Sequence, residues 1–248
     1  MEYVIAIPTY KRYVLKTMDY IKREKIPAEL ITIFVADETE YGIYHALWGD
    51  QYKIVIGVLG IGPQRNFITA YYPVGTYVVS MDDDIRDLIS LKGVGFSIWI
   101  QECLNWMHSC NINLLGVNPT SNVYWRMCSK APEYQSGRYF AVGVFHIYRI
   151  HALIEPLIFN LVEDYERSIK YLHQDGAVGR YNGVVLKTTF WANGGVKQAR
   201  TMEAYCAVVK EFAVKYSDDV HTNMKWIPAL SKLQMLPNLR INRHIKEP

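Results

Sequence analysis

The sequence predicts an α/β domain built around a mainly parallel sheet, and two patterns lead to this prediction. Short apolar runs alternate with segments of helical period through the first third of the chain, which is typical of βαβ units. The 248 residues are 50% hydrophobic, which is enough for one substantial core. We therefore expect a single α/β domain with helices on both faces of the sheet.

Four strands are expected before residue 90. They run from Tyr3 to Pro8, Leu30 to Asp37, Tyr52 to Val58 and Gly75 to Met81. Each is a short apolar run ended by a proline, an acid or a loop. A helix is predicted after the first strand, where apolar residues recur at helical spacing from Val14 to Ile21, and "GIGPQRNFITAYY" predicts a loop and a short helix before the fourth strand.

The remainder of the chain predicts more helices than strands. An apolar stripe from Phe96 to Met107 indicates a core helix, and the aromatic-rich run from Arg138 to Ile150 indicates a strand. Two further helices are expected over Leu161 to Leu172 and over Met202 to Tyr216, followed by an irregular basic tail.

Charge and cysteine content narrow the functional class. The formal net charge is only +3, but two segments, Thr120 to His151 and His221 to Pro248, are locally about +3 and about +4, which would suit a polyanion. The four cysteines form no CxxC pair, so neither a zinc knuckle nor a disulfide framework is indicated. With no charged-then-apolar leader and no apolar run of membrane-spanning length, we expect a cytoplasmic protein.

Three adjacent carboxylates, Asp82 to Asp84, follow the fourth strand directly. A solvated loop would explain them, and so would a divalent cation that needs oxygen ligands. In an extended segment Asp82 and Asp84 would share one face while Asp83 points away. The buried strand before them favours the cation, because it delivers the pair to a fixed place on the sheet.

Polar residues also follow the first and second strands. Thr9 to Arg12 come after the first, and Asp37 and Glu38 come after the second. In open parallel sheets, ligands bind outside the carboxyl ends of the strands. We therefore expect these residues and the aspartates to meet at one binding edge.

The order of five short elements resembles a known family. "AIPTYKR", an acid after the second strand, "GPQRN", "MDDDI" and a later "EDY" together look like a nucleotide-sugar glycosyltransferase of the GT-A fold, over roughly Tyr3 to Ile169. The "MDDDI" element, the short chain and "NGGV" resemble more narrowly the TET/JBP-associated glycosyltransferases of phages and kinetoplastids, which glycosylate hydroxymethylated pyrimidines in DNA. If the protein is phage-encoded, it would act in the host cytoplasm.

The resemblance implies a donor site and a metal site. The implied donor-binding residues are Pro8, Thr9, Arg12, Asp37, Arg65, Asn66, Asp82 and Asp83. The implied ligands of Mn²⁺ or Mg²⁺ are Asp84, Asp82 and His244. Plainer interpretations stay open: a helix cap for Asp37, a surface arginine for Arg65 and an exposed tail histidine for His244.

A second acidic site lies in "VEDYERS". In inverting enzymes of the resembled family the last acid of a similar stretch is the general base, which implies this role for Asp164, with Glu163 as the second choice. A capping role at a helix start would also explain these acids. The implied acceptor and DNA contacts are Trp191, Asn193, Gly194, Gly195, Arg240 and Arg243.

The resulting prediction is a metal-dependent inverting glycosyltransferase. It would move a sugar, with glucose from UDP-glucose as the first guess, onto 5-hydroxymethylcytosine or 5-hydroxymethyluracil in DNA. Residues 1–90 would bind the nucleotide sugar, residues 91–220 the acceptor, and residues 221–248 would form a basic tail. Two alternatives stay open: the same chemistry on a saccharide, lipid or protein acceptor, and a non-catalytic nucleotide-binding domain.

Overall fold

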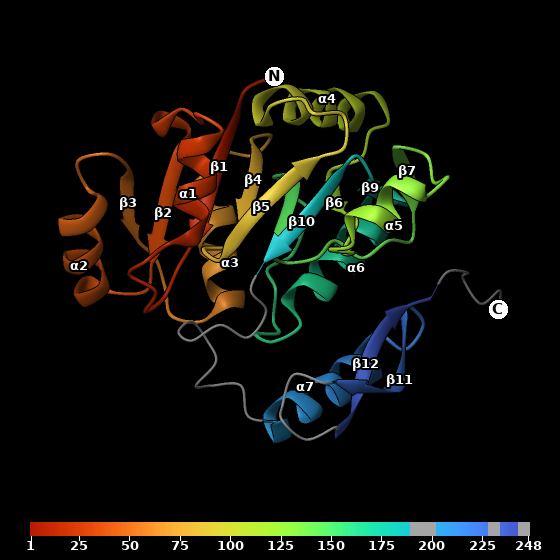
Figure 1. Cartoon of the computed structure of the whole chain (residues 1–248). Coiled ribbons are helices and arrows are strands. Elements are labelled where there is room, and N and C mark those ends of the chain that lie inside the picture. The colour runs from red at the N-terminus through yellow and green to blue at the C-terminus, as the bar shows by residue number, and fades with distance from the viewer. Residues whose placement is uncertain (189–201, 228–233, 243–248) are drawn as a thin grey trace.

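An eight-stranded sheet forms the centre of the computed structural model, which describes residues 1–188, 202–227 and 234–242 (Figure 1). The strand order is β3-β2-β1-β4-β8-β6-β9-β7. The strands are β1 (Tyr3–Pro8), β2 (Ile31–Val35), β3 (Lys53–Ile56), β4 (Tyr77–Met81), β6 (Leu114–Val117), β7 (Tyr134–Gly137), β8 (Phe145–Arg149) and β9 (Val178–Tyr181). Strands β8 and β7 run antiparallel to their neighbours, and the other neighbouring strands pair in parallel. The predicted α/β class with a mainly parallel sheet is confirmed.

Helices cover both faces of this sheet. The helices of the described residues are α1 (Lys16–Arg23), the 3-10 turn η1 (Ala28–Leu30), α2 (Glu38–Trp48), α3 (Ile61–Tyr71), α4 (Phe96–Ser109), α5 (Val123–Cys128), α6 (Glu163–Asp175) and α7 (Met202–Lys215). Alternate residues of β1 point to opposite faces: Ile5 joins a core with α1, α2 and α4, whereas Ala6 joins a core with α3 and α6. This period of two is the physical basis of the layered arrangement. None of the described helices is long and apolar enough to cross a bilayer.

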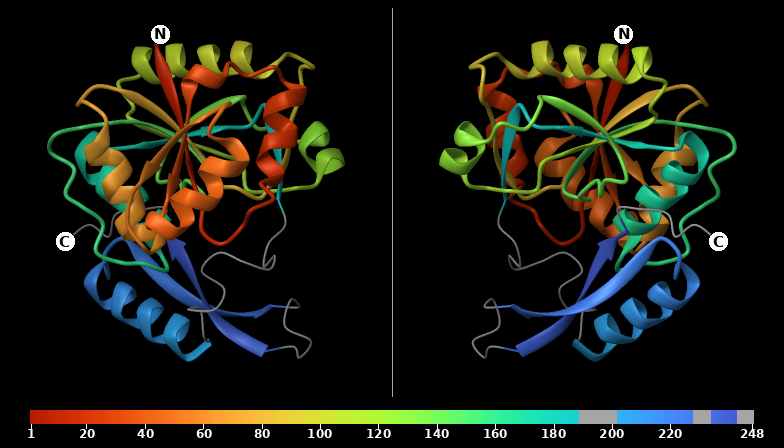
Figure 2. Two further views of the ribbon diagram at one scale, coloured as in Figure 1. Left: turned by 90° about the vertical axis from the view of Figure 1, so that its left-hand side faces the viewer. Right: turned by 90° about the vertical axis from the view of Figure 1, so that its right-hand side faces the viewer.

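Two small antiparallel sheets complete the fold. Strand β5 (Ile85–Ser90) pairs with β10 (Val184–Thr188), and β11 (Val220–Ile227) pairs with β12 (Gln234–Ile241). Helix α7 and the β11–β12 hairpin lie together below the main sheet (Figure 2). A third apolar core joins them to α6 through Phe159, Ile169 and Phe212.

The structure corrects two predictions of secondary structure. The predicted strand from Arg138 to Ile150 is shorter, because residues 138–144 form a loop and only Phe145–Arg149 pairs as β8. The tail predicted to be irregular contains β11 and β12. These strands stabilise each other by hydrogen bonds across the hairpin, a pairing that local apolar periodicity does not reveal. The division into donor half, acceptor half and tail stays a prediction.

Candidate active site

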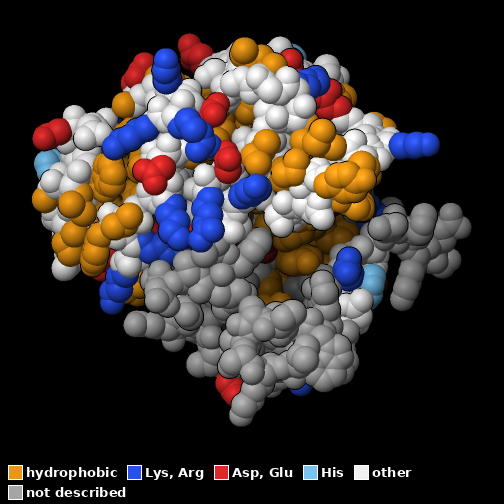
Figure 3. Space-filling view, in the orientation of Figure 1, with side chains coloured by type: hydrophobic (Ala, Val, Ile, Leu, Met, Phe, Trp, Pro, Cys, Tyr) orange, Lys and Arg blue, Asp and Glu red, His pale blue; other side chains and the backbone are white. Residues whose placement is uncertain are grey.

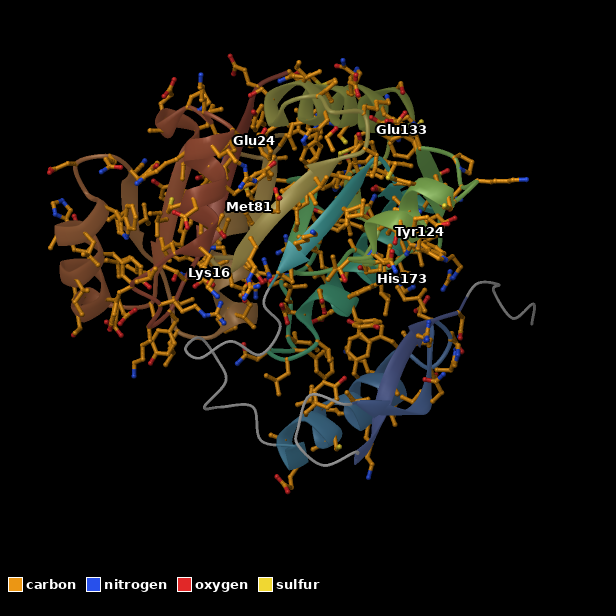
Figure 4. All side chains as sticks on the ribbon, viewed as in Figure 1. Lys16, Glu24, Met81, Tyr124, Glu133 and His173 are labelled. Atoms are coloured by element: carbon orange, nitrogen blue, oxygen red, sulfur yellow. The ribbon has the colours of Figure 1, made fainter. Side chains whose placement is uncertain are left out.

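The carboxyl ends of β1, β2 and β4 lie side by side, because β1 pairs in parallel with both of the others. The predicted polar residues therefore meet at one edge of the sheet. We call residues Asp82 to Asp84 the acidic turn, since β4 ends at Met81 and the chain bends there. Side chains from the loop after β1, from α3 and from β10 reach this turn. Met81, the residue just before it, is labelled in Figure 4.

Asp83 and Asp84 share one cationic partner. Nη1 of Arg12 donates to Oδ1 of Asp83 and, at 3.0 Å, to Oδ2 of Asp84. The hydroxyl of Thr9 donates to Oδ2 of Asp83 at 2.7 Å, and the hydroxyl of Thr188 donates to Oδ1 of Asp84 at 2.9 Å. The alternation expected of an extended segment is therefore wrong, because the turn directs Asp83 and Asp84 to the same guanidinium while Asp82 points elsewhere.

Helix α2 holds the loop after β1 through two side chains that sequence reasoning missed. The hydroxyl of Tyr44 lies 2.8 Å from that of Thr9 and accepts from the Arg12 amide at 3.0 Å. Oε2 of Glu40 accepts from the Lys11 amide at 2.8 Å, where the backbone takes a left-handed φ of 53°. Glu40 and Tyr44 lie one helical turn apart, and this i, i+4 spacing is the signal that would have paired them.

Arg65 lies at the centre of a second network. Its Nη1 donates to the Ser80 hydroxyl at 2.9 Å, and its Nη2 donates to Oδ1 of Asp82 at 3.1 Å and to the Gly143 carbonyl at 2.9 Å. Its Nε donates to Oε1 of Glu163 at 3.4 Å. The side chain is only 2% exposed. Arg65 therefore connects the acidic turn to the start of α6 and is not an ordinary surface arginine. Its predicted contact with the donor stays a prediction.

Asp164 has both carboxylate oxygens tied to backbone amides. Oδ2 accepts from the Gly143 amide at 3.1 Å, and Oδ1 accepts from the Tyr165 amide at 2.9 Å. Burial, then the neighbouring charge of Glu163, raises the pKa of Asp164 to about 7. Burial also raises the pKa of Asp82 to about 7 although Arg65 opposes the shift and 26% of the side chain stays exposed. The edge thus holds two carboxyl groups that titrate near neutrality.

A buried histidine beside this network also escaped sequence reasoning. His146 on β8 is 1% exposed, and its Nε2 lies 3.5 Å from Nη1 of Arg167. Burial and the positive charges of Arg167 and Arg65 hold its pKa well below the usual range. His146 is therefore neutral at physiological pH and contributes packing and polarity but no charge.

Other predicted donor residues have structural roles. The side-chain amide of Asn66 donates to the Leu157 carbonyl and accepts from the Leu157 amide, at 2.8 Å each, so it holds the backbone at Leu157. Its predicted donor contact stays a prediction. Asp37 caps α2 by accepting from the Glu40 amide at 2.9 Å, which is the plainer interpretation of that acid. The side chain of Asp37 remains exposed. Pro8 is the last residue of β1 and directly precedes the loop that holds Thr9 and Arg12.

Three arginines of the predicted basic segment from Thr120 to His151 contact other groups of the protein. Arg126 is 4% exposed and donates to the Asn182 carbonyl, and Arg138 pairs with Asp219 at 2.6 Å. Arg149 contacts the Gly75 carbonyl at the opposite edge of the sheet. These three arginines do not form a phosphate-binding strip, because Arg126 is buried and Arg138 and Arg149 contact groups within the protein. Arg240 is exposed on β12. Outside the described residues lie Trp191, Asn193, Gly194, Gly195, Arg243 and His244.

The carboxylate oxygens of the acidic turn are of the type that binds a hard cation such as Mg²⁺ or Mn²⁺. Within residues 1–188, 202–227 and 234–242 no group of three potential metal ligands comes together. However, Asp83 and Asp84 already hold a guanidinium between them, which shows that their oxygens converge on one positive charge. A divalent ion that keeps waters and nucleotide phosphates as ligands needs only one or two protein carboxylates.

Comparisons with known proteins give distant similarities. No family model matches the sequence, and no curated protein matches it. The chain is similar to a mannosyltransferase from Pyrobaculum calidifontis solved with GDP-mannose and Mn²⁺, at 11% identity and a TM-score of 0.37, covering 59% of this chain and 44% of that one. It is also similar to 4-diphosphocytidyl-2C-methyl-D-erythritol synthase from Anaerococcus prevotii, at 11% identity and a TM-score of 0.44, covering 76% and 92%. The chain thus spans less than half of the mannosyltransferase.

Proposed function

We propose that this protein is an inverting glycosyltransferase that uses a nucleotide-sugar donor. One observation carries the proposal: an acidic turn that converges on the Arg12 guanidinium lies at the same sheet edge as Asp164, whose pKa is raised, and Arg65 connects the two through Asp82 and Glu163. Transfer of a sugar needs both a positive charge for the departing phosphate and a base for the acceptor hydroxyl. A non-catalytic nucleotide-binding domain needs no such second carboxyl pair.

The donor is proposed to lie over the loop after β1. Thr9 and Arg12 would border the nucleotide, and the exposed Asp37 would lie near its base or ribose. Mn²⁺ or Mg²⁺ would be held by Asp84 and by Asp83, which converges on the same charge in place of the predicted Asp82, with His244 as a further predicted ligand. When bound, the ion would neutralise charge on the leaving diphosphate. UDP-glucose is the donor to test first.

Asp164 is the proposed general base. Its two oxygens accept one amide each, which fixes the carboxylate and leaves other lone pairs for the acceptor hydroxyl. As the acceptor oxygen bonds to the anomeric carbon and the bond to phosphate breaks, the hydroxyl proton passes to Asp164. Attack from the face opposite the nucleotide turns an α-linked donor into a β-linked product. Glu163 is the weaker candidate, because its carboxylate is buried against Arg65.

The proposed acceptor is the hydroxymethyl group of a modified pyrimidine in DNA. Its primary alcohol matches the chemistry of Asp164, and Arg240 and Arg243 would contact phosphates near the loop of Trp191, Asn193, Gly194 and Gly195. A saccharide acceptor is the second candidate, and one observation favours it. Tyr124 and Trp125 on α5 are 78% and 54% exposed, and exposed rings of this kind can stack on sugars.

The deciding experiment offers both acceptors. The protein is incubated with Mn²⁺, a panel of nucleotide sugars, and either hydroxymethylated DNA or a mixture of oligosaccharides, and the products are identified by mass. Transfer that depends on Asp84 and Asp164, and persists in Lys53→Ala, supports the proposal; Lys53 is exposed at the amino end of β3, opposite the candidate site. Transfer to a sugar alone selects the second acceptor. The absence of any transfer, with a nucleotide bound tightly, would leave the non-catalytic alternative.

A further inference from the structure

Arg12 and Arg65 neutralise neighbouring carboxylates in different ways. Arg65 donates from all three guanidinium nitrogens and is 2% exposed. Arg12 contacts both Asp83 and Asp84 through Nη1 alone, and its side chain is 18% exposed. Its Nε is buried and has no partner within the described residues. Arg12 therefore makes a single-nitrogen contact without the two-pronged fork that gives arginine its strongest carboxylate pairs.

The backbone beneath Arg12 is held much more firmly than its side chain. Tyr44 accepts from the Arg12 amide, and Glu40 accepts from the Lys11 amide. The hydroxyl of Thr9 bonds Asp83 independently of the guanidinium. The side chain can therefore leave the acidic turn while the loop keeps its shape. Thr188 would still orient one oxygen of Asp84 and leave the other open.

We propose that Arg12 occupies the cation position in the donor-free protein, so that a divalent ion enters the acidic turn only together with a nucleotide that draws Arg12 away. This inference rests on the proposed function. Two positive charges within a few ångströms of the same carboxylates repel each other strongly, so the guanidinium and the ion exclude one another. A diphosphate supplies the alternative partner, because arginine pairs well with phosphate oxygens.

The surroundings of the turn suit an incoming anion. Lysine and arginine side chains gather over the lower ends of β5 and β10 (Figure 3), and Lys16 lies in the same region (Figure 4). Lys16 precedes Thr17, whose hydroxyl donates to the Asp82 carbonyl at 2.6 Å, and the exposed Lys187 precedes Thr188. The diphosphate would thus be attracted to the border of the acidic turn and would compete there for Arg12.

The test measures binding of Mn²⁺, from the loss of the free-ion electron paramagnetic resonance signal, with and without UDP. Wild type should bind Mn²⁺ weakly alone and about tenfold or more tightly with UDP, and UDP should bind more tightly with Mn²⁺ by the same factor. Arg12→Ala should bind Mn²⁺ about tenfold more tightly than wild type without nucleotide, and UDP should then add much less. Asp84→Asn should abolish the gain in the double variant.

Two further variants separate the possible explanations. Lys53→Ala removes an equal charge from an exposed position at the amino end of β3, opposite the edge that holds the acidic turn, and should leave Mn²⁺ affinity unchanged. A general electrostatic effect would appear in both variants. Arg12→Gln keeps a hydrogen-bonding side chain and should also bind Mn²⁺ more tightly than wild type. This second variant keeps the test valid if Arg12→Ala does not fold. The inference would be overturned if, in the absence of UDP, wild type bound Mn²⁺ as tightly as both Arg12 variants do. Failure of UDP to bind under any condition would count against the proposed function, whereas the Mn²⁺ gain tests Arg12 by itself.

Discussion

Replacement of Arg65 by alanine tests whether the buried network holds the site together. The substitution removes contacts to Ser80, Asp82, Gly143 and Glu163. It leaves Glu163, which is 6% exposed in its side chain, without its positive partner. Breaking a buried ion pair by removing one partner typically costs about 3–5 kcal/mol. For a domain of this size, that cost corresponds to a decrease in melting temperature of about 6–20 °C.

The assay is equilibrium unfolding in urea at pH 7, with thermal unfolding as a second measure. Arg86→Ala is the matched control, because it removes an exposed arginine and should change the unfolding free energy by no more than about 0.5 kcal/mol. Glu163→Gln should cost less than Arg65→Ala, since the amide keeps the shape and one acceptor for Nε. An Arg65→Ala protein as stable as the control, with only its affinity for the donor reduced, would refute the structural role and restore direct donor binding.

Two other substitutions probe the α6 side of the site. Asp164→Asn should abolish transfer while calorimetry still detects donor binding, and the wild-type rate should rise with pH through about 7, where Asp164 loses its proton. Folding raises the pKa of Asp164 from 3.8 to about 7. The stability that its carboxyl group contributes is therefore complete below about pH 4 and is lost as the pH rises through 7. If Asp164→Asn has the same dependence of unfolding free energy on pH as wild type over this range, the raised pKa is contradicted. Gly143→Ala would place a Cβ 3.2 Å from both Nη2 of Arg65 and Oδ2 of Asp164. The free energy of unfolding in urea should therefore fall by about 1–3 kcal/mol. An unchanged free energy of unfolding would mean that these two side chains move aside freely.

The sequence by itself determined the first four strands of the main sheet and the place of the acids that follow them. Apolar runs at Tyr3–Pro8 and Tyr77–Met81 specify buried strands because every residue in them can face a covered sheet. A strand that ends on Asp82 delivers that acid to a ligand-binding edge, and a helix that begins at Glu163 places Asp164 in its first turn. These are local properties, and local periodicity and turn chemistry are enough to predict them.

Only the tertiary structure decided what each charged group does. From the sequence, Arg65 is interpreted as a surface or donor-binding arginine. The fold brings it into contact with Gly143 and Glu163, which lie 78 and 98 residues away in the chain. Thr188 reaches Asp84 across 104 residues, and the raised pKa of Asp164 depends on burial that no local pattern encodes. Burial and counter-charge come from contacts between distant segments, and a carboxylate or guanidinium takes its ionisation and its partners from those contacts.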